Sequence, residues 1–143
     1  MNTFQRTCLA AAVFASTALA GFADDLAKLE GKWTTKKTGP DGNSYTQTIE
    51  VKKGKFQFRV LRGSDDLVIY AEGTLKTETS GPFSVAHFTD IKAGASESDT
   101  NPINDDRASV YLLSDDTWTV AQNFDKERDG QKPSAEVYTR TKK

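Results

Sequence analysis

The segment YTQTIEVKKGKFQFRVL, residues 45–61, decides the fold. Apolar side chains recur at every second position on both sides of the turn sequence Lys-Lys-Gly-Lys at residues 52–55. A period of two indicates half-buried β-strands, and the glycine-containing turn indicates that the two strands form a hairpin. We therefore expect an antiparallel sheet built outward from this hairpin.

The same alternation continues in both directions along the chain. Turns rich in Gly, Pro, Asp and Asn separate the alternating runs, and these short connections exclude parallel βαβ units. The predicted strands are residues 32–38, 45–51, 56–61, 67–77, 83–91, 107–113, 118–124 and 135–141. Gly73 inside one strand indicates a bulge or bend. Residues 92–106 are predicted to form one long loop, and residues 24–30 a short helix.

Eight antiparallel strands joined in sequence order can close on themselves. Closure removes the exposed sheet edges, and a ring of eight strands is just wide enough to be filled by its own side chains or to hold one small ligand. The predicted fold is therefore all-β, an eight-stranded antiparallel up-and-down β-barrel with a short N-terminal helix.

Residues 1–23 have the pattern of an export signal. Arg6 gives a positive start, an apolar run follows at residues 8–15, and small residues precede two cleavage positions, after Ala20 and after Ala23. The apolar run is too short to span a bilayer. We expect residues 24–143 to form one exported domain, periplasmic or extracellular, without stable membrane insertion.

Composition excludes several classes of function. Without residues 1–23 the chain keeps 18 basic and 20 acidic residues, which gives no electrostatic footprint for nucleic acid. Cys8, the only cysteine, lies in the signal, so the mature chain has neither a disulfide nor a thiol nucleophile. His87 is the only histidine, which rules out a multi-histidine zinc site. We predict no catalytic residue, metal or cofactor.

The motif Leu-Glu-Gly-Lys-Trp at residues 29–33 resembles the Gly-x-Trp motif of lipocalins and their calycin relatives. In that group a tryptophan at the floor of the barrel is covered by a cation from near the end of the chain. Arg140 stands where that cation would be. The resemblance implies that Gly31, Trp33 and Arg140 form the structural signature of the closed end, with the guanidinium stacked on the indole.

The mature length is also similar to that of short lipocalin-like domains of bacteria. Shared features are Gly73-Thr74 in the fourth strand and Tyr111 before the Asp115-Asp116 turn. The chain is shorter than ordinary lipocalins and lacks their disulfides, so the resemblance implies a small hydrophobic ligand without specifying which one.

Five polar or aromatic side chains are candidate ligand contacts: Tyr45, Gln47, His87, Tyr111 and Gln122. Both glutamines interrupt apolar strand faces, as a pocket or the mouth of a barrel would require. The histidine shares a predicted inward face with apolar neighbours, but the simpler explanation is a hydrogen-bonded core residue, or an outward one if the register shifts by one residue. The tyrosines add hydroxyls to a pocket or serve as core.

Two functions from different classes remain open. The first is a soluble exported barrel that binds a small, largely apolar molecule at the end away from Trp33. The second is a barrel filled by its own aromatic side chains that acts as an interaction or scaffold module. An enzyme ranks only third, because the usual arrangements of catalytic residues are missing. The acidic pairs lie in predicted turns and do not match a calcium loop.

Overall fold

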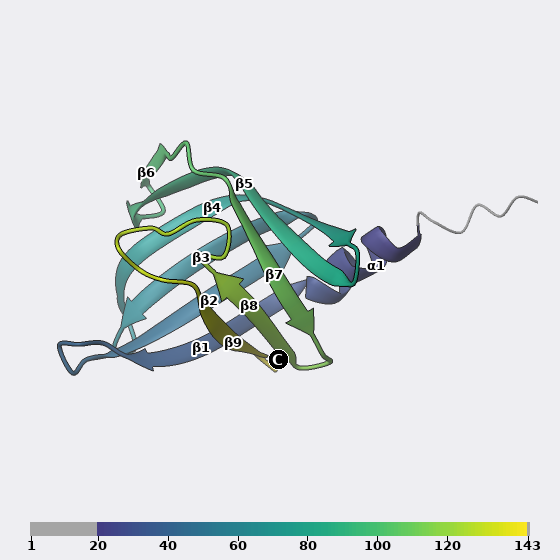
Figure 1. The fold of residues 1–143 in the computed structure, drawn as a ribbon. Coiled ribbons are helices and arrows are strands. Elements are labelled where there is room, and N and C mark those ends of the chain that lie inside the picture. Colours follow the sequence, from purple (N-terminus) through teal and green to yellow (C-terminus); the bar gives the residue numbers. More distant parts are fainter. Residues whose placement is uncertain (1–19, 143) are drawn as a thin grey trace, which may run out of the picture.

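The alternating segment forms the predicted hairpin, strands β2 (Ser44–Lys52) and β3 (Lys55–Arg62), in the computed structural model, which describes residues 20–142 (Figure 1). The other elements are α1 (Ala20–Leu29), β1 (Gly31–Thr38), β4 (Asp66–Ser80), β5 (Phe83–Ser96), β6 (Asp99–Pro102), β7 (Arg107–Leu113), β8 (Thr117–Gln122) and β9 (Ser134–Arg140). The predicted signal falls mostly on residues 1–19, which lie outside the described residues. The helix begins at Ala20, earlier than the predicted residue 24.

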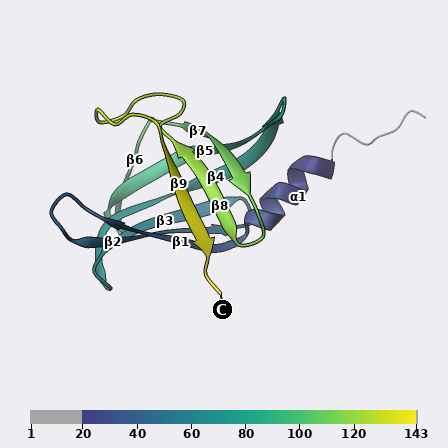
Figure 2. The same ribbon diagram turned by 60° about the horizontal axis from the view of Figure 1, so that its bottom comes forward.

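Eight strands close into a ring in the order β1-β2-β3-β4-β5-β7-β8-β9, and each is antiparallel to its neighbours. The last strand returns to the first, where Trp33 pairs with Arg140 and Thr34 with Thr139. This ring confirms the predicted eight-stranded up-and-down barrel. Helix α1 lies at one end of the barrel, and the long loops gather at the other end (Figure 2).

A ninth strand, β6, corrects the prediction of a single loop over residues 92–106. Strand β5 continues to Ser96 and folds back into β6, which pairs with its last third. The backbones approach so closely that a Cβ on Gly94 would lie 1.8 Å from the carbonyl oxygen of Asp99. The small residues that allow this approach do not alternate between apolar and polar, so the sequence does not predict a strand there.

The predicted inward face of β5 is wrong over its first half. Ala86 is fully buried and Phe88 packs against the core, whereas Phe83 on the opposite face is 58% exposed. A bulge then shifts the register against β4 between Glu72 and Thr74, and Ile91 returns to the interior. One extra residue exchanges the two faces of a strand, so a period-two pattern cannot be carried across a bulge.

Gly73 lies at this bulge, as predicted, and its lack of a side chain is what lets the strands meet. A Cβ there would lie 2.6 Å from the carbonyl oxygen of Thr89 and 2.9 Å from the ring of Phe56. The glycine therefore allows β4 and β5 to turn the corner of the barrel at close range.

Aromatic side chains fill the half of the barrel next to α1. Trp118 contacts the rings of Trp33, Tyr111 and Tyr138 at centroid distances of 5.7, 6.5 and 6.1 Å. All four are buried, and Leu29 at the end of α1 completes this packing. We call this region the closed half and the region toward the long loops the open half.

Candidate functional site

Arg140 and Trp33 close the barrel next to α1. The Arg140 Cζ atom lies 4.1 Å from the centroid of the Trp33 ring. Its Nη2 donates to the carbonyl of Lys28 at 2.7 Å, and its Nη1 donates to that of Glu30 at 2.8 Å. The Trp33 Nε1 donates to the intervening carbonyl of Leu29 at 2.8 Å. The two side chains thus satisfy three successive carbonyls where the helix ends, which would otherwise lack partners.

Gly31 lies in the narrow space below the guanidinium. Its φ of +120° falls in a region that residues with a side chain rarely adopt, and a Cβ there would lie 3.2 Å from Nη1 of Arg140. The predicted signature of Gly31, Trp33 and Arg140 therefore forms one connected structural unit. Trp33 is fully buried in this unit.

The open half contains a cavity of about 290 Å³, which we call the cup. Apolar side chains from β2 to β5, from β8 and from the residue after β6 form most of its wall: Ile49, Phe56, Phe58, Ile69, Ala71, Phe88, Ile91, Ala93, Ile103 and Val120. The edge-to-face contact of Phe56 with Phe88, with ring centroids 5.1 Å apart, fixes one side of this wall. A concave, mostly apolar surface of this kind is typical of a site for a small molecule.

Polar residues also contribute to the wall of the cup: one group surrounds the Tyr138 hydroxyl, and the others are Arg107, Ser109, Asn123 and Arg128. The Tyr138 hydroxyl donates to Gln47 Oε1 at 3.3 Å, and the Gln122 side chain is its second hydrogen-bond partner. Tyr138 and Gln122 line the cup, while Gln47 contacts Tyr138 from strand β2, which lies beyond β1 in the ring. Burial is the main cause that raises the pKa of Tyr138 above its usual value, and the charge of Glu136 adds to it. The hydroxyl therefore remains a neutral donor.

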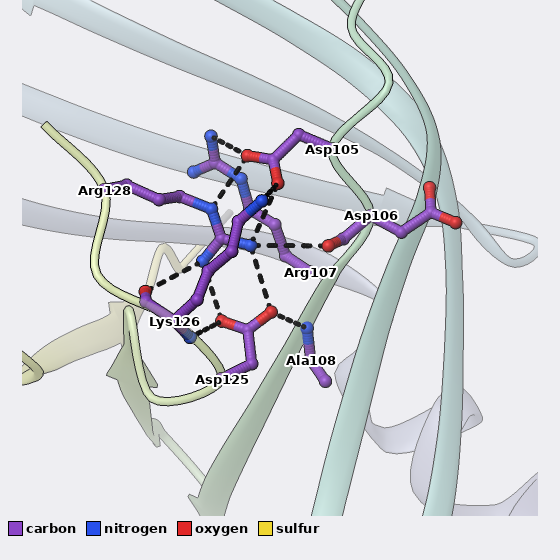
Figure 3. A network of polar contacts seen from close by, with 7 residues as sticks. All are labelled: Asp105, Asp106, Arg107, Ala108, Asp125, Lys126 and Arg128. Carbon is purple, nitrogen blue, oxygen red and sulfur yellow. Dashed lines mark hydrogen bonds and ion pairs between the residues drawn. The ribbon is translucent and has the colours of Figure 1, made fainter.

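Charged side chains bind the two loops at the rim of the cup to each other (Figure 3). Arg128, in the β8–β9 loop, donates from Nε to Asp105 Oδ2 at 2.7 Å and from Nη1 to Asp125 Oδ1 at 2.7 Å. Its Nη2 reaches both carboxylates and the carbonyl of Asp106. Asp125 in turn accepts from the backbone N–H of Ala108 at 3.2 Å. We call these residues the rim network.

The pKa values of the two carboxyls record how strongly this network favours their charged form. The hydrogen bond from Arg128 is the largest cause for both, and it lowers the pKa of Asp125 to about 2. The pKa of Asp105 also lies well below its usual value, because Lys126 donates to it as well. The two carboxylates raise the pKa of Arg128 in return.

The structure brings Gln122 into the lining of the cup and places Gln47 behind it, in contact with Tyr138. Tyr111 also points inward, but it lies in the closed half, where its hydroxyl donates to Asp25 of α1 at 2.9 Å. Burial and this contact raise the pKa of Tyr111. Its position joins the helix to the core and keeps the residue away from the cup.

Two candidate contacts lie outside the cup. The Tyr45 hydroxyl donates to Asp41 Oδ2 at 2.7 Å in the β1–β2 turn, where the strand extends beyond the barrel and its ring covers Gly39. His87 lies on the outer face of β5, and its Nε2 contacts Glu78 Oε1 at 2.8 Å. The misplaced register of β5 explains this error, because a shift by one residue turns the imidazole to the outside.

Sequence reasoning missed Tyr138, Arg107 and Arg128, all of which line the cup. A signal for Tyr138 was present, since it lies two residues before Arg140 and must share its inward face. No such signal existed for Arg128. Its partner Asp105 is 23 residues away in another loop, and only the closed barrel brings the two together.

Two larger grooves, of about 530 Å³ each, lie elsewhere on the surface. One runs beside β6 past Asp90 and Asp106, and the other lies between α1 and the β7–β8 turn, next to Asp25 and Arg140. Polar groups contribute about half of the surface of each groove, whereas the smaller cup is mostly apolar and is therefore the better candidate for an apolar ligand. Among the described residues, no three His, Cys, Asp or Glu side chains form a group that could hold a metal ion.

The fold and the site together define a class of protein: a closed antiparallel barrel that is filled by side chains at one end and hollowed into an apolar cup at the other. Comparison of the chain with models of known families, with curated proteins and with solved structures finds no match. The resemblance to lipocalins accordingly stays a prediction from the sequence motif. Over residues 20–142, no helix is long and apolar enough to cross a bilayer.

Proposed function

We propose that this protein binds a small, neutral, largely apolar molecule in the cup of its barrel. The observation that carries the proposal is the contrast inside one barrel. Side chains fill the closed half, while the open half keeps a cavity of about 290 Å³ with a mostly apolar wall and a few polar groups, at Tyr138 and Gln122, at Ser109 and at the rim. Apolar burial provides the affinity in such a site, and a few polar groups fix the orientation of the ligand.

The charges at the rim favour a neutral ligand. Arg107, Lys126 and Arg128 all contact the carboxylate of Asp105, at 3.5, 2.6 and 2.7 Å. A charged ligand would have to displace one of these partners or enter the apolar wall unpaired, and both are costly. A neutral ligand leaves the rim network intact.

Gln122 is the side chain that we expect to bind the polar group of the ligand. An amide has two donor hydrogens and one acceptor oxygen, and the Tyr138 hydroxyl uses only part of this capacity. The remaining groups can bind a hydroxyl, a carbonyl or an amide on an otherwise apolar molecule. Tyr138 and Gln47 would hold the Gln122 side chain in place.

Two fluorescent dyes that differ by one charge test this proposal. N-phenylnaphthylamine is neutral, whereas anilinonaphthalene sulfonate has nearly the same aryl groups and an added anionic group. We expect the neutral dye to bind with a Kd at least about tenfold lower, which corresponds to about 1.4 kcal/mol. Equal affinities, or a preference for the sulfonate, would contradict a site selective for neutral molecules.

A matched pair of variants places the dye in the cup. Ala71 lines the cup, while Ala121 lies on β8 between the inward-facing Val120 and Gln122 and faces outward. Ala71→Leu should fill the cavity and abolish binding of the neutral dye, and Ala121→Leu should leave binding unchanged. If both variants bind like the wild type, the dye occupies another surface and the proposed site is wrong.

An apolar outer face supports the interaction module as a second candidate. Leu112 is 74% exposed and pairs with Thr119, which pairs in turn with Val137, itself 52% exposed. Phe83 lies beside Leu112 on the next strand, so the face spans β5, β7, β8 and β9. Sedimentation of the wild type against Leu112→Ser tests this role: a larger species that is lost in the variant would favour it.

Export is part of the proposal and rests on the pattern of residues 1–23. Cleavage after Ala20 would keep nearly all of α1, whereas cleavage after Ala23 would remove its first turn. Both positions keep Asp25, Lys28 and Leu29, which contact the barrel. N-terminal sequencing of the protein recovered outside the producing cell distinguishes the two, and an intact Met1 in that protein would contradict cleavage.

A further inference from the structure

The β8–β9 loop, residues 123–133, crosses the mouth of the barrel, and we call it the strap (Figures 1 and 2). Two of its residues, Asn123 and Arg128, belong to the lining of the cup. Anything that enters or leaves the cup at this side must pass the strap, so the forces that hold the strap decide how readily the cup opens.

Charge holds the strap in place, and hydrophobic burial contributes almost nothing. Its only large apolar side chain, Phe124, is 61% exposed. The rest of the strap is exposed except for Asn123 and Arg128, and the Arg128 side chain keeps only 9% of its surface accessible. A loop without apolar contacts has little to keep it closed once its polar contacts are broken.

Arg128 is the central contact between the strap and the barrel. It reaches across to Asp105 and the carbonyl of Asp106 in the loop before β7. Two weaker attachments support it: Asp125 accepts from the N–H of Ala108, and Lys126, with a side chain that is 58% exposed, contacts Asp105. Arg128 also binds Asp125 within the strap. Loss of the Arg128 side chain therefore removes its hydrogen bonds to both carboxylates, Asp105 and Asp125.

The backbone of the strap changes direction sharply before and after the residues that make this contact. Asn123, directly after β8, has a φ of 54°, and Asp129 has a φ of 53° before Gly130. Asparagine and aspartate tolerate this left-handed conformation better than other residues with a side chain, and it places sharp changes of direction there. The Asp129-Gly130 turn is closed by a hydrogen bond from the Gln131 N–H to the Arg128 carbonyl at 2.9 Å, so residues 128–131 form a compact tip whose attachment to the barrel depends on side chains, while β8 and β9 are paired independently of it.

We infer that the strap is a gate over the cup and that the contact of Arg128 with Asp105 and Asp125 is its latch. This inference rests on the proposed function, because a gate requires a site behind it. Opening the latch exposes the cup for exchange of the ligand, and closing it retains the ligand. The latch accordingly controls the rates of binding and release more than the affinity.

The test compares the full chain with two variants that each remove one positive charge from the strap. Arg128→Gln breaks the latch, while Lys132→Gln is the matched control, since Lys132 is exposed and no contact of its side chain is found among the described residues. The Ala108 N–H donates a hydrogen bond to Asp125, so its hydrogen exchange reports opening of the strap in the absence of any ligand. Stopped-flow fluorescence with N-phenylnaphthylamine reports the rates of binding and release.

For Arg128→Gln we expect about tenfold faster exchange at Ala108, because hydrogen bonds to a charged group are lost. Association and dissociation of the dye should both accelerate severalfold. Lys132→Gln should match the wild type in every measurement. Far-UV circular dichroism confirms that both variants keep the barrel.

Each other outcome overturns a specific statement. Unchanged exchange at Ala108 in Arg128→Gln means that Arg128 is not a latch. Faster exchange with unchanged dye kinetics means that the strap opens but does not gate the cup, and the proposed binding function survives. Faster exchange in a protein that binds no neutral dye before or after the substitution refutes the gate together with the proposed function.

Discussion

Two arginines close the two ends of this barrel, and they do so by different means. At the end next to α1, Arg140 donates to the backbone carbonyls of Lys28, Glu30 and Asp115 and stacks on Trp33. At the mouth, Arg128 binds mainly side-chain carboxylates of two loops. Backbone carbonyls at the end of a helix cannot move away from the fold, whereas carboxylates on loops can turn to water.

The comparison indicates which end of the barrel contributes more to the stability of the fold. Arg140 covers a core of packed aromatic rings, so breaking its contacts disturbs the packing of the whole closed half. Arg128 borders a cavity, and its partners can be hydrated without loss of any core contact. Stability should therefore depend chiefly on the closed half, and exchange with solvent on the open half.

The largest expected difference comes from truncating one aliphatic side chain in each half. Leu75 is 1% exposed and lies in the closed half. Leu75→Ala should lower the free energy of unfolding by about 3 kcal/mol, because it opens a cavity in packed surroundings. Ile103→Ala at the cup should cost about 1 kcal/mol, since the side chain already borders a cavity. Urea unfolding measures both.

Equal losses of stability in these two variants would show that the cup is packed as tightly as the closed half. A changed dependence of the unfolding free energy on urea concentration would show that the denatured or native state had changed, and that variant would then need a milder replacement, such as Leu75→Val or Ile103→Val.

The two arginines give the next difference. Arg140→Gln should lower the unfolding free energy by about 2–3 kcal/mol, because three carbonyls lose a charged donor and Trp33 loses its cover. Arg128→Gln should cost about 1 kcal/mol or less, because Asp105 and Asp125 can turn to water. Thermal unfolding of both variants checks this order, and a larger loss for Arg128→Gln would reverse the comparison.

Arg140→Lys is the control for charge in this pair. It keeps the cation but removes the planar fork that reaches several carbonyls at once. Its stability should lie close to that of Arg140→Gln. Full stability in Arg140→Lys would instead show that a positive charge alone secures the closed end.

The closed half was largely predictable from the sequence, because its determinants are local or repeat with a fixed period. Gly31 and Trp33 stand in one short motif, and the strand pattern places Arg140 on the same inward face. Alternation also placed Gln47 and Gln122 on inward faces, since no bulge interrupts the pairing of β2 with β1 and β3 or that of β8 with β9.

The open half was less predictable, because its contacts depend on where the closed ring brings distant loops. Strand β6 has no apolar pattern, and the bulge opposite Gly73 reversed the face of β5, which misplaced His87. The rim network joins Asp105 to Arg128 across two strands and a turn. No spacing in the sequence signals such a pair, since loop charges usually mark solvated surface.

The two tryptophans of the closed half offer a smaller and sharper contrast. Both are fully buried, but Trp33 Nε1 donates to Leu29, whereas Trp118 Nε1 has no hydrogen-bond partner among the described residues. Both Phe substitutions remove a similar volume, so their difference reflects the hydrogen bond of Trp33 Nε1 together with the stacking of Arg140 on the Trp33 ring. Trp33→Phe should be less stable than Trp118→Phe by about 1–2 kcal/mol, as chemical unfolding would measure.

The outcome that would contradict this contrast is equal stability of the two variants. In that case the Trp118 N–H would have a partner of comparable strength, such as the face of a neighbouring ring. The wavelength of tryptophan fluorescence in the two single-tryptophan proteins gives a second measurement. Trp118 alone should emit like an indole free of hydrogen bonds, at shorter wavelength than Trp33 alone.

The smallest effect expected near neutral pH concerns acid and the rim network. The pKa of Asp125 lies at about 2 and that of Asp105 is lowered as well, so both stay ionised well below the pKa of an unfolded carboxyl. A carboxyl with a lowered folded-state pKa contributes stability above its unfolded pKa, near 3.8, and loses it as the pH falls toward the folded value. The latch should therefore hold from pH 7 to about pH 4 and release near pH 2.

Carbon chemical shifts of the two carboxyls, followed together with exchange at Ala108, measure this release directly. Arg128→Gln should raise both carboxyl pKa values toward their ordinary range, since its hydrogen bonds are the largest cause of the shift. The variant should then lose its remaining strap contacts already near pH 4. If acid opens the wild-type strap at the same pH as the variant, the carboxylates are held by something other than Arg128, and the contrast between the two arginines loses its basis at the mouth of the barrel.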